Sequence, residues 1–512
     1  MLDLSVGTQL PLEPSGIEGL DQIGYGGLPR GRSTVVSGTA GSGKTLLAMQ
    51  FLVEGTLRYD QAGVFCTFEE LPDDLMHNVV SFGWDLPALV ADRRLNFVDA
   101  TQHPGDDFLE VGSFDLSGLL ARLENAVRKV GAKRVVLDAV GGLFPQFSDA
   151  NVVRRELHRI YMGLRSLDVT TIVTIERIEE EGPVGRFGVE EFVADNVIVL
   201  RNRLEMERRR RTVEILKFRG TAHQKGEFPF TIDPRSGMTI LPLSAFELVQ
   251  RSTEERVSSG NPELDGMCGG GLYRDAIILV SGATGTGKTL TVSKYIEAAV
   301  NAGERAILFG GEESPDQMRR NAAGWGIDLA AAEEAGLLRI VCRYPEEMGL
   351  EDHTIRIKRE IEDFQPTRVA VDSLSAFERG TATKPFREFF IGLSGHLKLK
   401  KITGMFTTTT AMLGPGESPT DTHISTITDT IILLRYVELN GNMRRALTVL
   451  KMRGTRHDHN IREYWIDDSG MHIEGPFVGV HGILSGAPIY DFRNERERLD
   501  TMFETDRFNG RP

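Results

Sequence analysis

The segments GTAGSGKT at residues 38–45 and GATGTGKT at residues 282–289 decide the fold of this 512-residue chain. Each follows an apolar run and precedes a helix-like segment, which is the context of the phosphate-binding loop GxxxxGK[ST]. The glycines of such a loop let backbone N–H groups curl around phosphates, and the N-terminus of the following helix adds partial positive charge. We expect the lysines to reach the β- and γ-phosphates of a nucleotide and the threonines to place a hydroxyl on Mg²⁺. These residues are Lys44, Thr45, Lys288 and Thr289.

The rest of the chain repeats as well. The segment LDQIGYGGLPRG at 20–31 is matched by LDGMCGGGLYRD at 264–275, and the two phosphate loops share the same offset of 244 residues. KFRGTAH at 217–223 is matched by KMRGTRH at 451–457, at an offset of 234. A unit of about 240 residues is too long for a solenoid repeat. We expect two domains and a tail without a counterpart, spanning residues 1–247, 248–485 and 486–512.

Each copy alternates apolar strand-like runs with helical segments. This pattern predicts an α/β fold, with a mainly parallel sheet and helices on both faces. A short polar turn joins the last two strands of each copy, which predicts an antiparallel hairpin at the sheet edge. The expected strands are 33–38, 63–68, 133–140, 170–175, 196–201 and 212–218, then 276–282, 306–311, 368–374, 402–408, 430–436 and 447–452.

Charge and composition exclude several classes of protein. The formal net charge of −14 disfavours nucleic acid as a partner, because binding phosphates requires a basic face. The chain has 3 cysteines and no CxxC pair, which excludes a disulfide scaffold and a zinc ribbon and fits a reducing cytosol. We see no signal-peptide pattern and no run of ~18 apolar residues, so we expect a cytoplasmic protein without a membrane partner.

Acidic residues end two of the expected strands. Asp138 ends RVVLD and Asp372 ends RVAVD, so both are Walker-B candidates that would orient Mg²⁺. The alternative is that each caps the next helix.

A pair of glutamates follows the strand after each loop helix, Glu69-Glu70 in the first copy and Glu312-Glu313 in the second. A carboxylate there can accept a proton from a water or hydroxyl that attacks the γ-phosphate. Repulsion between adjacent carboxylates raises one pKa and favours its action as a base. The alternative is that they are acidic first-turn residues of a helix, which explains one glutamate of each pair better than both.

Cations recur in the motif KxRGT near the end of each copy, as Lys217 and Arg219 and as Lys451 and Arg453. An isolated cationic pair on a strand is usually solvated surface. Repeated in a nucleotide-binding protein, it predicts a clamp that stabilises phosphoryl charge on a neighbouring subunit, and therefore a ring with ATP at each interface.

Two further matched pairs suggest contacts with the nucleotide. His223 and His457 occupy equivalent positions just after KxRGT and are candidates to touch a ribose. Phe82 and Trp325 match at an offset of 243 and either line an adenine pocket or pack in the core.

Longer segments resemble those of the KaiC family, tandem RecA-like ATPases of circadian clocks. The resemblance covers about residues 14–485 and is much more specific than a phosphate loop alone. It rests on TFEE (67–70), ERIEEEGPVGRFGVEEFVADNV (176–197), ERRRRTVEILKFRGTAHQKGEFPFTI (207–232), MCGGGL (267–272), GATGTGKT (282–289), GLEDH (349–353), VDSLSA (371–376) and HISTITDTIILLRYVEL (423–439).

The resemblance implies a hexameric double ring that uses ATP and Mg²⁺, with a slow N-terminal ATPase ring and a C-terminal autokinase and autophosphatase ring. The implied first nucleotide site is Thr39, Ala40, Gly41, Ser42, Gly43, Lys44, Thr45, Leu46, Ser81, Lys217, Phe218, Arg219, Thr221 and His223. The implied second site is Thr284, Gly285, Thr286, Gly287, Lys288, Thr289, Leu290, Glu312, Trp325, Arg445, Lys451, Met452 and Arg453. The expected Mg²⁺ ligands are Thr45, Asp138, Thr289, Glu312 and Asp372. The implied phosphoacceptors are Ser425 and Thr426, with Thr420 as a transient carrier.

The resemblance also implies KaiA-like and KaiB-like clock partners and an output histidine kinase. Two departures from the family pattern stand out. Asp233-Pro234 replaces a Thr-Asp pair after FTI, and the tail after Gly486 differs in the region where KaiA binds.

The repeat itself supports the acceptor assignment. At the offset of 234, Ser425 falls on Glu191 and Thr426 on Phe192, while the flanking strand is preserved. A glutamate cannot carry a phosphoryl group as a stable ester, whereas serine and threonine can. The alternative is that the two hydroxyls are merely polar residues before a threonine-rich strand.

Two other functions compete with this interpretation. A RecA-type DNA-dependent ATPase would need basic or aromatic loops facing a channel, which the negative charge disfavours. A KaiC-family ATPase that signals outside any clock would carry the same motifs.

Overall fold

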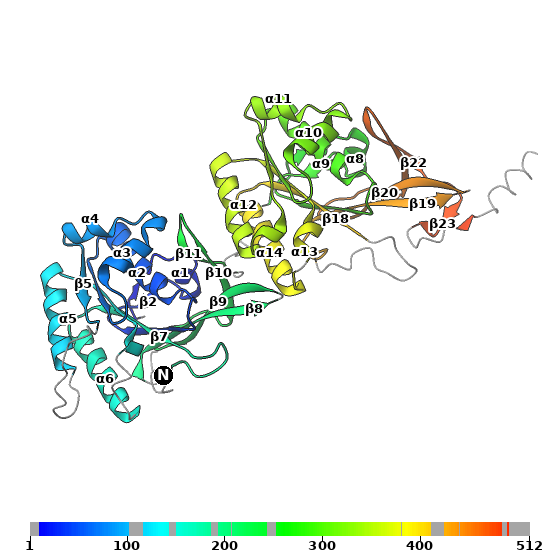
Figure 1. Ribbon diagram of the computed structural model, residues 1–512. Helices are drawn as coiled ribbons and strands as arrows, with labels where there is room; N and C mark the ends of the chain where they lie inside the picture. The colour runs from blue at the N-terminus through cyan, green and yellow to red at the C-terminus, as the bar shows by residue number, and fades with distance from the viewer. Residues whose placement is uncertain are drawn as a thin grey trace, which may run out of the picture. The chain divides into compact units, whose positions relative to one another are not determined.

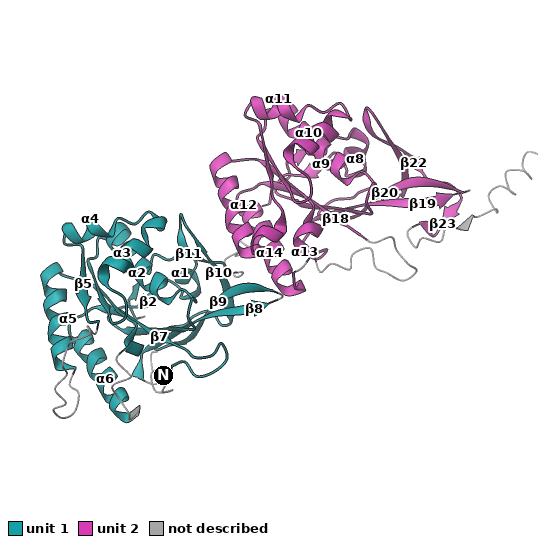
Figure 2. Ribbon diagram, in the orientation of Figure 1, with its two compact units in different colours: residues 1–245 teal, residues 246–512 magenta. Residues whose placement is uncertain are grey.

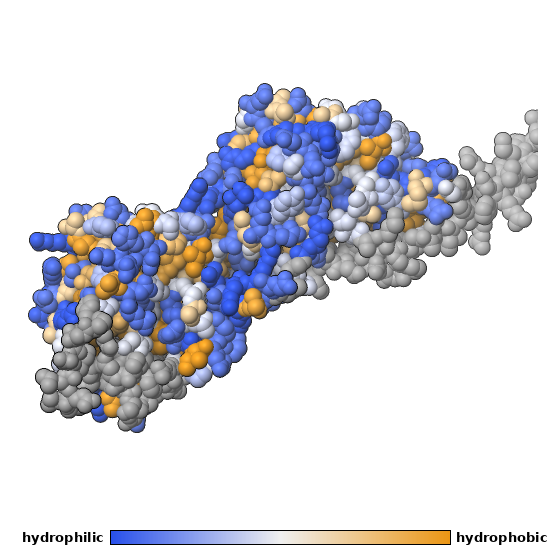
Figure 3. All heavy atoms as spheres, viewed as in Figure 1, coloured by the Kyte–Doolittle hydropathy of each residue, from blue (hydrophilic) through white to orange (hydrophobic). Residues whose placement is uncertain are grey.

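The computed structural model describes residues 10–101, 116–142, 150–185, 193–205, 207–242, 252–379, 381–410, 424–439, 441–483 and 489–490. The chain divides into two compact units, residues 1–245 and 246–512 (Figure 2). On the face shown in Figure 3, hydrophilic residues cover most of the surface of each unit, and hydrophobic residues are scattered among them. Among the described helices, none has the length and apolarity needed to cross a bilayer. The domain boundary expected at residue 247 lies outside the described residues.

Unit 1 is built on a nine-stranded sheet (Figure 1). Across the sheet the strands are β11 Gly237–Ile240, β10 Glu227–Asp233, β9 Arg208–Phe218, β8 Asn196–Glu205, β3 Ser33–Gly38, β7 Thr170–Glu176, β6 Arg134–Asp138, β4 Gly63–Thr67 and β5 Leu95–Asp99. The strands from β8 to β5 are parallel, whereas β9, β10 and β11 add antiparallel pairs. The helices are α1 Leu20–Ile23, α2 Lys44–Tyr59, α3 Pro72–Asn78, α4 Leu86–Ala91, α5 Ser117–Val130 and α6 Ala150–Ser166.

Unit 2 repeats this topology strand for strand. Its strands are, from the opposite edge, β16 Leu338–Cys342, β15 Ala306–Gly310, β17 Arg368–Asp372, β18 Thr403–Thr409, β14 Ile277–Gly282, β19 Thr430–Leu439, β20 Asn442–Met452, β21 Arg462–Asp467 and β22 Gly470–Pro476. The helices are α8 Pro262–Met267, α9 Lys288–Asn301, α10 Pro315–Ala323, α11 Leu329–Glu334, α12 Leu350–Phe364, α13 Leu374–Glu378 and α14 Thr383–Leu399. Short strand pairs complete the two units: β1 Leu12–Glu13 with β2 Leu28–Pro29, β12 Arg256–Val257 with β13 Leu272–Tyr273, and β23 Val480–His481 with β24 Ile489–Tyr490.

The predicted α/β fold with a mainly parallel, helix-flanked sheet is confirmed, but the predicted position of each hairpin is wrong. The pairs β8–β9 and β19–β20 are antiparallel hairpins, as expected. Neither lies at an edge, because β10 and β11, and likewise β21 and β22, extend each sheet beyond it. The opposite edges are formed by β5 and β16, which are short parallel strands absent from the prediction.

Each sheet buries side chains on both faces. In β3, Val36 packs in a core with α1 and α2, while its neighbour Val35 faces a second core built with α5 and α6. Successive side chains of a strand point to opposite faces, so one strand supplies both cores. This burial on both faces explains the continuous apolar runs of the central strands.

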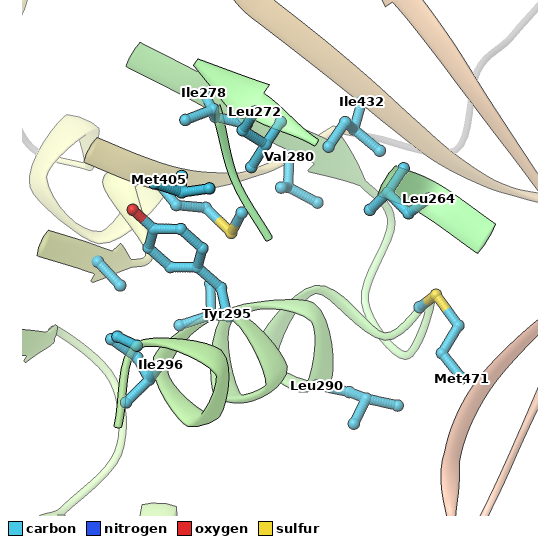
Figure 4. Close-up of a cluster of buried hydrophobic side chains, with 14 of the residues drawn as sticks. Leu264, Leu272, Ile278, Val280, Leu290, Tyr295, Ile296, Met405, Ile432 and Met471 are labelled. Carbon is cyan, nitrogen blue, oxygen red and sulfur yellow. The ribbon is translucent and has the colours of Figure 1, made fainter. Parts of the chain in front are cut away.

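Unit 2 has the same two-layered core. Figure 4 shows Tyr295 of α9 directed toward Met405 and the central strands, and Leu290 and Ile296 of the same helix belong to the same buried cluster as Val280. Tyr295 is fully buried, and its hydroxyl donates to the backbone oxygen of Thr403 at 3.0 Å. The loop helix is therefore fixed to the central strands, which holds its N-terminus in place.

A buried arginine at the start of β6 ties the N-terminal segment to unit 1. Arg134 is 0% exposed, and its guanidinium donates to the backbone oxygens of Phe51 at 2.8 Å and Pro14 at 2.7 Å. It also donates to Gln61 Oε1 at 2.6 Å and lies 3.6 Å from the Glu13 carboxylate.

Candidate nucleotide-binding sites

The first phosphate loop joins β3 to α2. Gly41 and Gly43 have φ values of 73° and 95°, a left-handed conformation that glycine adopts without strain. Lys44 begins α2, and its ammonium donates to the backbone oxygen of Thr39 at 2.9 Å. The loop therefore has the form that the sequence predicts for a phosphate cradle.

The second loop, between β14 and α9, has the same geometry. Gly285 and Gly287 have φ values of 80° and 96°. The ammonium of Lys288 donates to the backbone oxygens of Gly282 at 2.9 Å and Ala283 at 3.0 Å. Burial lowers the pKa of Lys288, and the charges of Asp372 and Glu312 oppose that lowering.

Each loop threonine meets an aspartate that ends a strand two places away in the sheet, β6 in unit 1 and β17 in unit 2. Thr289 Oγ1 donates to Asp372 Oδ2 at 2.7 Å, and Thr407 holds the other carboxylate oxygen. In unit 1, burial raises the pKa of Asp138, while hydrogen bonds from Thr174 and Thr45 oppose that rise. Hydroxyl and carboxylate oxygens suit Mg²⁺. Among the described residues, no three His, Cys, Asp or Glu side chains lie together as a metal site, so a bound Mg²⁺ would take further oxygen ligands from hydroxyls, phosphates or water.

A cavity of about 620 Å³ adjoins the second loop, within the range typical of ligand pockets. The predicted site residues that line it are Thr284, Gly285, Gly287, Lys288, Thr289, Leu290, Glu312, Glu313, Trp325, Asp372 and Arg445. Thr286 is buried beneath the loop, and its hydroxyl donates to the backbone oxygen of Ala283 at 2.7 Å.

Several lining residues were missed by the sequence reasoning: Met318, Arg320, Asn321, Gly324, Ser373, Thr409 and Ile466. The repeat offered a signal for one of them, because Asn321 matches Asn78 at the offset of 243 that relates the glutamate pairs. Ser373 lies within the quoted VDSLSA segment, whereas the remaining residues belong to no motif named above.

The second glutamate of each pair is held by that asparagine. Asn78 Nδ2 donates to Glu70 Oε2 at 3.1 Å, and Asn321 Nδ2 donates to Glu313 Oε2 at 3.0 Å.

The first glutamates of the two pairs differ in their surroundings. Burial raises the pKa of Glu69, and the negative charges of Glu176 and Asp138 raise it further. Glu312 instead forms an ion pair with Arg379. The two sites therefore place their first glutamates in opposite electrostatic environments.

Three of the four cations of the KxRGT motifs, Lys217, Lys451 and Arg453, bind backbone oxygens of their own chain. Lys451 Nζ donates to Ser425 O at 2.8 Å and Thr428 O at 2.7 Å, and Arg453 donates to Thr426 O at 2.7 Å. Lys217 repeats the pattern with the backbone oxygen of Ala194 at 2.8 Å. None of these cations lines the cavity at the second loop.

The remaining predicted residues of the first site lie partly in the loop itself and partly on other elements. Ser81 lies on an exposed 3₁₀ turn, next to Phe82, whose ring stacks on Trp84. Phe218 is buried in the core of unit 1, and its ring contacts the ring of His223. Met452, the equivalent residue of unit 2, is also buried. Arg219 lines a separate hollow of about 510 Å³ together with cationic residues of α6. Ala40, Gly41, Ser42, Gly43, Leu46 and Thr221 lie in the loop, in the first turn of α2 and after β9.

The predicted acceptors occupy a turn just before β19. Ser425 is half-buried and Thr426 is exposed, and their backbone oxygens are held by Lys451 and Arg453. Thr420, Glu191 and Phe192 lie outside the described residues.

Comparisons with a family model and with known proteins point to the same family. The family model described as KaiC ATPase matches residues 13–245 and 257–476. The circadian clock protein KaiC3 of Synechocystis sp. (strain ATCC 27184 / PCC 6803 / Kazusa) is 55% identical over 490 residues, covering 96% of this chain and 97% of that relative. The circadian clock oscillator protein KaiC of Thermosynechococcus vestitus (strain NIES-2133 / IAM M-273 / BP-1) is 56% identical over 487 residues, covering 95% of this chain and 93% of that relative.

Proposed function

Because this chain belongs to the KaiC family of ATPases and carries two tandem domains of that family, we propose that its two units use ATP differently. The first unit hydrolyses ATP. The second unit transfers the γ-phosphoryl group to Ser425 and Thr426 of the protein itself and later removes it.

The observation that carries this proposal is the convergence of residues at the second loop. One cavity of about 620 Å³ brings together Lys288, Thr289, Asp372 and the glutamate pair. The lysine and the loop N–H groups bind the phosphates. Mg²⁺, when bound beside Thr289 and Asp372, neutralises charge on the phosphates.

The glutamate pair then serves the transfer step. The hydroxyl oxygen of Ser425 or Thr426 forms a bond to the γ-phosphorus, and the bond from that phosphorus to the β,γ-bridging oxygen breaks. The electron pair leaves with ADP, and Glu312 or Glu313 accepts the hydroxyl proton. In the first unit, Glu69 or Glu70 takes the proton of a water molecule in the equivalent step.

The position of the acceptors favours a ring of several chains. Ser425, Thr426, Lys451 and Arg453 do not line the cavity of their own chain. The side chains of Arg219 and Arg453 are each 52% exposed, so a neighbouring subunit's nucleotide can reach them. A homohexamer with ATP at each interface accounts for this arrangement. ATP should then stabilise the ring, and a chain that stays monomeric in saturating Mg-ATP would contradict it.

The names of the relatives extend the proposal to a timing role. Both relatives are described as circadian clock proteins. We infer a cytoplasmic oscillator component that works with KaiB-like and KaiA-like proteins and an output histidine kinase. Following the phosphorylation state for two days, with and without such partners, tests this role.

Phosphopeptide mapping tests the enzymatic proposal. After incubation with Mg-ATP, phosphate should appear on Ser425 and Thr426. The chain with both residues changed to alanine should still hydrolyse ATP but take up almost no phosphate. Phosphate found mainly in the first unit, or undiminished in that variant, would refute the assignment.

A further inference from the structure

The two loop lysines differ in the number of carboxylates around them. Burial lowers the pKa of Lys44, and four carboxylates oppose this: Glu176 most strongly, then Asp138, Glu69 and Glu180. At Lys288 only Asp372 and Glu312 do so. Asp138 matches Asp372 and Glu69 matches Glu312, so the carboxylates without a match at the second site are Glu176 and Glu180.

Sheet register identifies what replaces Glu176 in the second unit. In unit 1 the last residue of β7, Glu176, pairs with Gly38, the first glycine of the phosphate loop. In unit 2 the last residue of β18, Thr409, pairs with the equivalent Gly282. A carboxylate at the edge of the first loop is therefore exchanged for a neutral hydroxyl at the second.

The pleat of the strand directs this position into the site. Thr174, two residues before Glu176, hydrogen-bonds the Asp138 carboxylate, and residues two apart in a strand share a face. Thr407 makes the same bond to Asp372, and Thr409, two residues later, lines the cavity of the second site. Glu176 is also the carboxylate that acts most strongly on Glu69.

The chemistry of the two proposed acceptors explains the exchange. Water has two O–H groups, so holding it in one orientation requires two acceptors, whereas a serine or threonine hydroxyl has one. Glu69 and Glu176 supply two carboxylates beside the first loop. At the second loop, Glu312 is a carboxylate and Thr409 is not.

On the proposed division of labour between the units, we propose that Glu176 is the water-positioning residue of the first site and that Thr409 suits the second site to a protein hydroxyl. Glu176 accepts a hydrogen bond from one O–H group of the attacking water, and Glu69 takes the proton of the other. The water oxygen forms the new bond to the γ-phosphorus, and ADP leaves with the electron pair of the broken bond.

The test uses the full chain with Lys288→Ala, so that ATP hydrolysis reports the first site. Glu176→Thr should lower kcat by about tenfold or more, because one partner of the attacking water is lost. KM for ATP should stay within about threefold or fall, since the removed charge repels phosphates. Glu176→Asp should recover part of kcat. Glu179→Gln removes a nearby exposed carboxylate from the same segment and should change kcat less than twofold.

The outcomes separate the inference from the function beneath it. If the Lys288→Ala parent does not hydrolyse ATP, the proposed ATPase role of the first unit is refuted, and the inference with it. If the parent hydrolyses ATP but Glu176→Thr keeps its kcat, or loses activity only through KM, the inference alone is overturned. Binding of a fluorescent ATP analogue by each variant shows that the site is folded.

A reciprocal change gives a second, independent readout. In the chain with Lys44→Ala, Thr409→Glu should raise the amount of free phosphate released relative to the phosphate on Ser425 and Thr426. An unchanged or lower ratio would contradict the inference, since the added carboxylate should favour water over the protein hydroxyl.

Discussion

Lys451→Met should loosen the turn that carries the proposed acceptors. The ammonium of Lys451 donates to the backbone oxygens of Ser425 at 2.8 Å and Thr428 at 2.7 Å. A hydrogen bond from a charged donor contributes about 1.5–3 kcal/mol, and the partial exposure of this lysine reduces that figure. Losing both hydrogen bonds should lower the local stability of the turn by about 2–3 kcal/mol, which corresponds to a roughly 30- to 150-fold increase in the population of its open state.

Hydrogen exchange measures this opening directly. The amides of Ile427 and Asp429 are protected by hydrogen bonds to Ile424 O at 2.9 Å and Ile277 O at 2.8 Å. In the nucleotide-free protein their exchange should accelerate by the predicted factor, and phosphate uptake should fall in parallel. Lys217→Met is the matched control, because it removes the equivalent bond to Ala194 in unit 1 and should leave residues 424–429 unaffected. Unchanged exchange at Ile427 in Lys451→Met would refute the reasoning.

Three further predictions concern binding, stability and pH. Lys44→Ala and Lys288→Ala should each remove about half of the nucleotide bound at saturation, as measured by titration with labelled ATP. Complete loss of nucleotide binding in both variants would contradict two separate sites. Arg134→Met should lower the free energy of unfolding of unit 1 by about 3–5 kcal/mol in urea denaturation, since it strands the buried Glu13 carboxylate and several carbonyl oxygens. Burial, together with the charges of Lys358 and Lys400, lowers the pKa of His396 from 6.5 to about 4. Because the unfolded chain binds this proton more readily, the free energy of unfolding of unit 2 should fall by up to about 3 kcal/mol as the pH falls from 6.5 to 4. His396→Leu should flatten that dependence on pH.

The sequence predicted the features that depend on local pattern. The phosphate loops, the loop helices and the central strands followed from glycine spacing and from apolar runs long enough to be buried on both faces. The outer strands escaped prediction because β10 pairs with β9 over only three residues, one of them Pro229, and proline is a poor strand signal.

The site was predictable where its residues lie on the repeated motifs. The glutamate pairs and the strand-end aspartates stood out because each occurs twice at a fixed offset. Glu176 did not stand out, because the repeat pairs it with a threonine, and only the sheet register places the two at the same point. The contacts of Lys451 with its own acceptor turn also depend on an antiparallel pairing that sequence spacing does not give.

The central claim is that one chain gives the γ-phosphoryl group to water in one unit and to protein in the other. The most direct measurement is to follow free phosphate and protein-bound phosphate together in two variants supplied with Mg-ATP. Glu312→Gln with Glu313→Gln should abolish phosphate on Ser425 and Thr426 and leave much of the ATP hydrolysis. Glu69→Gln with Glu70→Gln should remove most of the hydrolysis and leave phosphate uptake by the protein. Equal loss of both activities in either variant would contradict the account.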